Sequence, residues 1–171
     1  SATDNRKIQT RFDNNQAMVR LPLNDTDAFL EAMDDQVCAV LVEGVLGIGG
    51  IHEPTTDFLK LLREQCDKYG AHLILDEVQS GFGRTGDFFA HQKSGVVADI
   101  IAMAKGMGNG FPVGGVISKP KLESWKGMLG STFGGNHLAC AAVLAVLEII
   151  EQDHLLTNAK ERGQQLMDFF G

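Results

Sequence analysis

An acidic residue and a lysine each follow a short apolar run near the middle of the sequence. Leu73-Ile74-Leu75 leads into Asp76, and residues 100–104 lead into Lys105. Short apolar runs bounded by turn residues are typical of strands buried on both faces of a parallel sheet. The carboxyl ends of such strands meet at one edge of the sheet, where ligands usually bind. We therefore expect Asp76 and Lys105 to converge at that edge.

The chemistry open to this pair is that of pyridoxal 5'-phosphate (PLP). A lysine amine can attack the cofactor's aldehyde and form a Schiff base. A carboxylate that faces the pyridine nitrogen keeps it protonated, so that the ring can accept electrons from a carbanion. Strand periodicity turns Glu77 to the opposite side, so only Asp76 of the two acids should face the ring. Taken alone, each residue has a simpler interpretation. Lys105 could be a loop lysine without a chemical role, and Asp76 could be an acid that caps a loop.

Two further patterns have competing interpretations. Residues 81–86 match GxGxxG, but a dinucleotide fingerprint needs its glycines to open a helix. Here two acids precede the glycines and a short aromatic segment follows them, so we interpret the match as coincidental. Ser131 and Thr132 precede a long helix whose N-terminal amides could hold an anion. One of these hydroxyls, or Asn136, could equally cap that helix.

Apolar spacing and turn residues predict the elements that position these side chains. Strands alternate with helices, which predicts an α/β fold with a mainly parallel sheet. The helix over 137–152 is apolar almost all round, so we expect it to be buried. Residues 1–20 show no clear period. The predicted strands cover residues 37–43, 72–78, 99–104 and 113–118, and the predicted helices cover about 25–34, 54–70, 87–93, a brief stretch after Pro120, 137–152 and 153–171.

Composition excludes several classes of protein. The chain has 171 residues with a formal net charge of −7, which argues against nucleic acid or an anionic membrane surface as a partner. No apolar run reaches the ~20 residues of a membrane helix, and the polar N-terminal residues do not resemble a signal peptide. The three cysteines are scattered and the five histidines lack metal-ligand spacing. We therefore expect a cytoplasmic protein without a disulfide framework or a metal site.

Three stretches of the sequence together resemble the class III PLP-dependent aminotransferases, and within that family the acetylornithine aminotransferase branch. They are LILDEVQSGFGRTG (73–86), AKGMGNGFPVGG (104–115) and STFGGNHLACA (131–141). The resemblance implies a partial three-layer αβα domain with a mainly parallel sheet, like the large domain of fold type I PLP-dependent transferases. Residues 1–152 would form this partial PLP-binding domain, and residues 153–171 would begin the connection to a C-terminal domain.

The same resemblance implies a role for each residue of the candidate site. Lys105 would form the Schiff base with PLP, and Asp76 would pair with the pyridinium nitrogen. Val78 would pack on the ring face and Gln79 would lie near the ring hydroxyl. Thr132 would contact the phosphate of the PLP held by the other subunit of a homodimer. The activity implied is transfer of the δ-amino group of N-acetylornithine, or another N-acylornithine, to 2-oxoglutarate in arginine biosynthesis.

The loop that starts at Glu43 departs from the family pattern. Members usually read Glu-Pro-x-Gln-Gly-Glu-x-Gly, whereas this chain has Gly44, Leu46 and Ile48 at the proline, glutamine and second glutamate. Glu43 is therefore left out of the catalytic set. Two alternatives stay open, namely another class III ω-aminotransferase acting on ornithine or 4-aminobutyrate, and an isolated fragment with no activity of its own.

Overall fold

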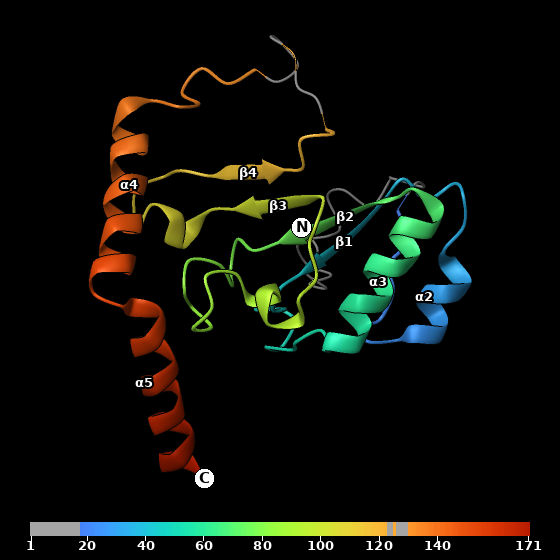
Figure 1. Ribbon diagram of the computed structural model, residues 1–171, viewed down its shortest axis with the longest axis horizontal. Coiled ribbons are helices and arrows are strands. Elements are labelled where there is room, and N and C mark those ends of the chain that lie inside the picture. The colour runs from blue at the N-terminus through green and yellow to red at the C-terminus, as the bar shows by residue number, and fades with distance from the viewer. Residues whose placement is uncertain (1–17, 123–124, 126–129) are drawn as a thin grey trace.

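A four-stranded sheet forms the centre of the structure, a computed structural model that describes residues 18–122, 125 and 130–171. The strands lie in the order β1-β2-β3-β4, with β1, β2 and β3 parallel and β4 antiparallel to β3 (Figure 1). The predicted α/β class with a mainly parallel sheet is confirmed. The strands are β1 (Ala39–Glu43), β2 (His72–Asp76), β3 (Ile100–Met103) and β4 (Gly115–Ser118).

Polar side chains and a glycine set the limits of the first two helices. The Asp25 side chain accepts a hydrogen bond from the backbone N–H of Ala28 at 3.0 Å, and the Thr55 hydroxyl accepts one from Phe58 at 3.1 Å. Gly70 ends the second helix in the left-handed region, with φ of 74°. The helices are α2 (Thr26–Ala32), α3 (Thr56–Tyr69), α4 (His137–Gln152) and α5 (Leu155–Phe170), with short 3₁₀ helices η1 (Ala90–Ser94) and η2 (Lys105–Met107).

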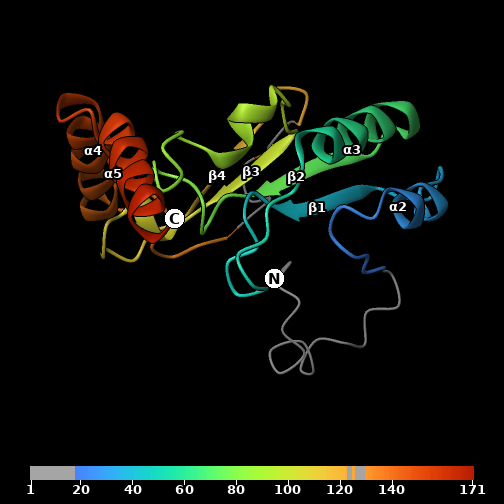
Figure 2. The ribbon, with the colours of Figure 1, turned by 90° about the horizontal axis from the view of Figure 1, so that it is seen from below.

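The hydrophobic core lies between α3 and the sheet. Leu59, Leu62 and Cys66 of α3 meet Leu73 and Leu75 of β2, and none of these five side chains is more than 1% exposed. Burial of a leucine of this kind contributes about 1.5–3 kcal/mol relative to an exposed one. Figure 2 shows α3 and η1 on this face of the sheet. In the described part of the chain no helix covers the opposite face, where Leu41 is 45% exposed.

The buried side chain of Asp99 connects α3 to the sheet at the amino ends of β2 and β3. Asp99, which precedes β3, is 1% exposed. Its Oδ2 accepts hydrogen bonds from Arg63 Nη1 at 2.7 Å and from the backbone N–H of Leu73 at 2.9 Å, and Lys119 Nζ lies 3.0 Å from Oδ1. Burial by itself raises the pKa of this carboxyl, but the donors of Arg63, Leu73 and Lys119 together hold that pKa below its usual range. Asp99 is therefore a carboxylate at neutral pH.

Most predicted elements are shorter in the structure by one or two residues at an end, and one of them is of another type. β2 ends at Asp76 rather than at residue 78, because the backbone N–H of Gly81 bonds to the carbonyl of Glu77 at 2.9 Å and closes a turn there. The helix predicted over 87–93 is a short 3₁₀ helix over Ala90–Ser94, which ends at Gly95 with φ of 71°. In both places local hydrogen bonds decide the boundary.

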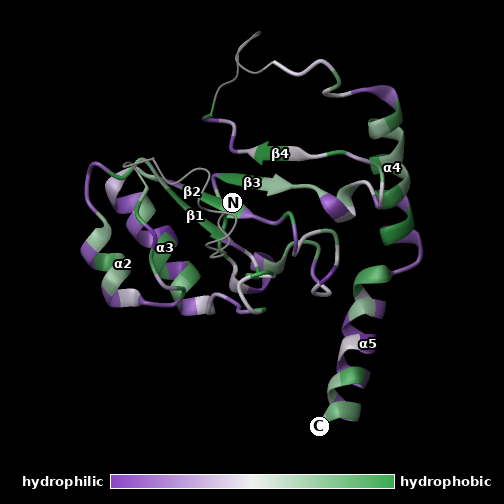
Figure 3. Ribbon diagram, turned by 180° about the vertical axis from the view of Figure 1, so that it is seen from behind, coloured by the Kyte–Doolittle hydropathy of each residue, from purple (hydrophilic) through white to green (hydrophobic). Residues whose placement is uncertain are grey.

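The prediction that the helix over 137–152 is buried is wrong. The helix forms with the predicted limits, and the Asn136 side chain caps it by accepting from the backbone N–H of Ala139 at 2.9 Å. Among its residues only Ala139 is buried, whereas Leu138 and Leu144 are 72% and 59% exposed. Figure 1 shows α4 and α5 beyond the end of the sheet, and Figure 3 shows hydrophobic residues all along α4. A helix that is apolar all round needs neighbours on every side, and the described residues supply them on one side only.

Some predictions fall outside the described residues. These are the absence of a clear period over residues 1–17 and most of the brief helix expected after Pro120, which runs into residues 123–124 and 126–129. Among the helices that the structure does describe, none has the length and apolar character to cross a membrane.

Candidate active site

Asp76 and Lys105 lie at the same edge of the sheet. Asp76 is the last residue of β2 and pairs in register with Ala102 of β3. Neighbouring strands lie about 4.8 Å apart. Lys105 follows Ala102 by three residues, which span at most roughly 11 Å. Asp76 therefore ends one strand, and Lys105 follows the carboxyl end of the neighbouring parallel strand by two residues.

Local backbone structure restrains both Asp76 and Lys105. Asp76 is half-buried, and its Oδ1 accepts a hydrogen bond from the backbone N–H of Val78 at 2.9 Å. Lys105 begins η2 with φ of 48°, in the left-handed region that residues other than glycine seldom adopt. Such conformations are often found at functional sites, where the surrounding structure holds them in place.

The Gln79 side chain connects the loop after β2 to Lys105, which follows β3. Its side-chain oxygen accepts a hydrogen bond from Lys105 Nζ, and both side chains are exposed. They open into a hollow of about 440 Å³ whose wall also contains Arg84 and residues 110–113. This solvent-accessible hollow places an amine, an amide and a guanidinium beside one another.

Glycines let the loops around Lys105 approach closely. A Cβ at Gly106 would lie 3.1 Å from Phe82 Cβ and 3.7 Å from Arg84 Nε. A Cβ at Gly108 would lie 2.3 Å from the carbonyl oxygen of Phe111, so no side chain fits there. The glycine-rich sequence after Lys105 thus allows contact with the loop after β2.

Glu77 points away from this hollow, as the pleat of the strand predicts, and is fully buried. It accepts hydrogen bonds from the Ser80 hydroxyl, from the backbone N–H groups of Ala90 and His91 at 3.1 Å each, and from His91 Nδ1 at 2.7 Å. Burial by itself raises the pKa of Glu77, but these donors, His91 first among them, hold that pKa below its usual value. Glu77 is thus a buried carboxylate that only accepts, so His91 Nδ1 carries the shared proton.

The structure does not bring every predicted site residue together. Val78 is half-buried beside Asp76, and Gln79 touches Lys105. Thr132 lies exposed in the loop before α4, which Figure 1 shows on the far side of β4 from η2. Of the predicted set, the structure therefore gathers Asp76, Val78, Gln79 and Lys105 and leaves Thr132 apart.

Sequence patterns alone did not reveal two features of the site. One is Arg84, which lines the hollow beside Lys105. The other is the set of donors around Glu77. The strand pleat already placed Glu77 on the buried side, and a buried carboxylate must find donors. That requirement could have directed attention to Ser80 and His91.

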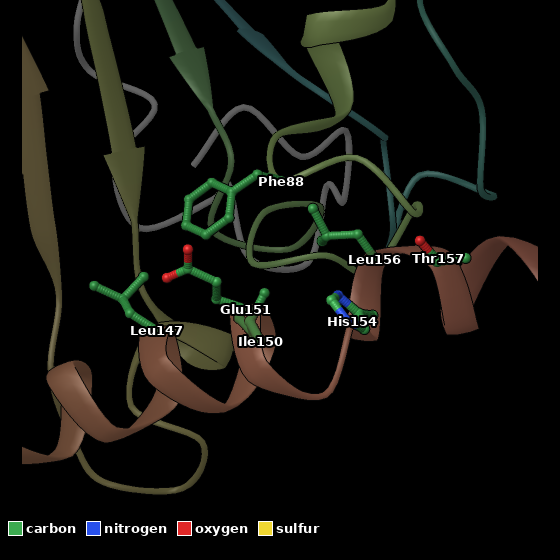
Figure 4. Close-up of a pocket in the computed structure, with 7 residues that line it drawn as sticks. All are labelled: Phe88, Leu147, Ile150, Glu151, His154, Leu156 and Thr157. Atoms are coloured by element: carbon green, nitrogen blue, oxygen red, sulfur yellow. The ribbon is translucent and has the colours of Figure 1, made fainter.

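The loop that carries Arg84 is held on its outer side by α5. A Cβ at Gly83 would lie 2.8 Å from Leu156 Cδ2, and Lys160 Nζ bonds to Asp87 Oδ1 at 2.8 Å. Two residues join α4 to α5, and the second of them, His154, has φ of 52°. Figure 4 shows a second hollow of about 430 Å³ at this junction, lined by Phe88, Leu147, Ile150, Glu151, His154, Leu156 and Thr157.

The side chains at this edge of the sheet suit PLP better than a metal ion. PLP needs an amine for its aldehyde and a carboxylate for its ring nitrogen, and Lys105 and Asp76 provide them at one sheet edge. Among the residues that the structure places, no group of three or more histidine, cysteine, aspartate or glutamate side chains could hold a metal. All three cysteines are free.

Comparisons with known proteins give one family. The family model described as aminotransferase class-III matches residues 2–169. The acetylornithine aminotransferase of Caldanaerobacter subterraneus subsp. tengcongensis is 48% identical over 145 residues, which are 84% of this chain and 37% of that protein. The chain therefore spans little more than a third of the length of this relative.

Solved structures agree in fold. The acetylornithine aminotransferase of Elizabethkingia anophelis superposes with a TM-score of 0.83 at 34% identity, covering 90% of this chain and 42% of that one. The ornithine δ-aminotransferase of Plasmodium falciparum gives 0.81 at 31% identity, covering 86% of this chain and 39% of that one.

Proposed function

This chain belongs to the class III aminotransferase family, and from that membership we propose that it forms the part of a transaminase that holds PLP through Lys105. The complete enzyme transfers the δ-amino group of N-acetylornithine, or of another N-acylornithine, to 2-oxoglutarate. The observation that carries the proposal is the pairing of β2 with β3, which sets Asp76 and Lys105 at one edge of the sheet with Gln79 bonded to the amine.

When bound, PLP supplies a conjugated ring that accepts electrons from the substrate carbon. The residues of this chain have separate roles around it. The Lys105 amine would hold the cofactor covalently, and once freed by the substrate amine its Nζ would take up a proton from the substrate carbon that bears the transferred amino group. The Asp76 carboxylate would keep the ring nitrogen protonated. Val78 and Gln79 would help to hold the ring, and Gln79 also orients the Lys105 amine.

We further propose that the enzyme is a homodimer in the cytoplasm. Thr132 would then contact the phosphate of the cofactor in the other subunit, which suits its exposed position away from Lys105. A second subunit would also cover apolar side chains that α4 and α5 expose, such as Leu138 and Phe169, which are 72% and 80% exposed.

Substrate choice has a second candidate, ornithine itself or another ω-amine. Two observations favour keeping it: the similarity to the ornithine δ-aminotransferase fold, and the loop after Glu43, which has Leu46 and Ile48 where the family has glutamine and glutamate. Steady-state kinetics of the complete enzyme with N-acetylornithine, N-succinylornithine, ornithine and 4-aminobutyrate would decide. A higher kcat/KM for ornithine or 4-aminobutyrate than for both N-acylornithines would overturn the proposed substrate.

Cofactor binding is tested separately, by titrating PLP into the purified protein and following the visible band of the lysine adduct and its loss on borohydride reduction. We expect peptide mass spectrometry to place the reduced adduct on Lys105. An adduct on another lysine would overturn the assignment. A complete enzyme that forms the adduct, beside a 171-residue chain that does not, would show that the segments outside this chain are needed to bind the cofactor.

A further inference from the structure

Glu77 bonds to both ends of one loop, residues 78–89. Near the start of the loop, its Oε2 accepts from the Ser80 hydroxyl, and just past the end the same oxygen accepts from the backbone N–H of Ala90 at 3.1 Å. Its Oε1 accepts from the backbone N–H of His91 at 3.1 Å and from His91 Nδ1 at 2.7 Å. A carboxylate has about four acceptor positions, so these four donors use its capacity. One side chain thus closes the base of the loop.

The surroundings of Glu77 give it no freedom to shift. The residue is 0% exposed. A Cβ at Gly44 would lie 2.8 Å from Glu77 Oε1 and 2.6 Å from Ser80 Oγ, and a Cβ at Gly81 would lie 2.8 Å from the carbonyl oxygen of Glu77. Glycine at position 44 lets the backbone approach the Glu77 carboxylate this closely, and glycine at position 81 does the same for the Glu77 backbone. Because the site is tightly packed, a change at Glu77 must be taken up by the loop.

The loop that Glu77 closes carries the partner of the Lys105 amine. Gln79 lies between Glu77 and the anchored Ser80, and its oxygen accepts from Lys105 Nζ. Farther along the loop, Phe82 packs beside Gly106, next to Lys105. Movement of the loop would therefore displace the group that holds the amine.

We propose that Glu77 is a positioning residue for the reaction, which holds Gln79 against the Lys105 amine by closing loop 78–89. The proposal rests on the proposed function, because it assigns Glu77 to the lysine that binds PLP. Glu77 itself is buried and does not line the hollow beside Lys105. It acts through the loop, and the loop acts on Lys105.

Asp99 offers a matched control. It is as buried as Glu77 and also accepts from a backbone N–H and from charged side chains. Its partner Arg63 belongs to α3 and its partner Lys119 directly follows β4, and neither lines the hollow beside Lys105. Loss of either carboxylate should lower stability, but only Glu77 should affect the lysine.

The experiment compares Glu77→Gln with Asp99→Asn in the complete, PLP-loaded enzyme. Glutamine keeps the shape but leaves only one oxygen to accept, so half of the donors lose their partner. We expect kcat to fall by about 10- to 100-fold in Glu77→Gln with a smaller change in KM, the range for a displaced catalytic group. Asp99→Asn should stay within about twofold of the wild type in kcat, although its melting temperature also falls.

A second readout does not depend on activity. The enzyme freed of PLP is treated briefly with acetic anhydride, and mass spectrometry measures how fast Lys105 is acetylated relative to the exposed Lys60 of α3. We expect this ratio to rise by about threefold in Glu77→Gln, as loss of one hydrogen bond predicts, and to stay unchanged in Asp99→Asn. If Glu77→Gln does not fold, Ser80→Ala removes one donor alone and should move the same ratio in the same direction.

Equal behaviour of Glu77→Gln and Asp99→Asn in both readouts would overturn the positioning role. A wild-type enzyme without transaminase activity would instead overturn the proposed function. The acetylation ratio would still decide whether Glu77 holds the Lys105 amine in place.

Discussion

The face of the sheet beneath α3 and the carboxyl edge of the sheet are built by different means. Between α3 and β2, packing of leucines dominates, and Leu62, Leu73 and Leu75 are all but excluded from solvent. At the carboxyl edge around Lys105, hydrogen bonds and glycines determine the positions, and the Lys105 and Gln79 side chains are exposed. The first region supplies stability and the second supplies chemistry. Changes in the two regions should therefore be separable by experiment.

The largest expected effect belongs to the exposed edge. Lys105→Ala in the complete enzyme should lower kcat by roughly 10³-fold or more, because the group that binds the cofactor is lost. The urea midpoint of the PLP-free protein should hardly move, since the side chain is exposed. Near-normal turnover by this variant would remove Lys105 from the catalytic role.

The reverse result is expected from the core. Leu62→Ala should lower the free energy of unfolding by about 2–5 kcal/mol, because it leaves a cavity beneath α3. Urea denaturation measures this loss. Activity per folded molecule should stay close to the wild type, and a large fall in kcat at full folding would show that the two regions are not separable.

The stability that Asp99 contributes on the core side of the molecule should depend on pH. Its folded pKa lies below its value in the unfolded chain, about 3.9, so the unfolded state takes up the proton first as pH falls. The stability that Asp99 contributes is therefore present above about pH 4 and is lost as pH falls toward the folded pKa. Urea midpoints measured from pH 6 to pH 3 should fall more steeply for the wild type than for Asp99→Asn. Parallel curves would contradict the role of this carboxylate.

The smallest effect is expected at the outer side of the loop. Lys160 is 58% exposed at its side chain, and the Asp87 side chain is 30% exposed, so solvent screens their ion pair. Lys160→Met, which keeps the stem that packs beside Gly86, should cost no more than about 1 kcal/mol. Differential scanning calorimetry in low and in high salt would measure this, and a loss that persists in 1 M salt would indicate that packing of the stem had changed.

The sequence predicted the core side of the molecule well because periodic patterns determine it. The apolar stripe of α3, its end at Gly70 and the run before Asp76 each follow from the spacing of a few residue types. The edge depends on contacts between residues distant in sequence. Glu77 and His91 are fourteen residues apart, and no local pattern predicts their hydrogen bond. The exposure of α4 escaped prediction for a related reason, since hydropathy indicates what a helix needs as neighbours and not whether they are present.

The junction between α4 and α5 makes the length of the chain there critical. Only Asp153 and His154 separate the two helices, and His154 takes a left-handed conformation. One inserted residue would rotate α5 by about 100° about its axis. Leu156 and Lys160 would then turn away from Gly83 and Asp87, which they meet only in the present register. We expect substitutions at Asp153 and His154 to be tolerated far better than insertions or deletions between α4 and α5.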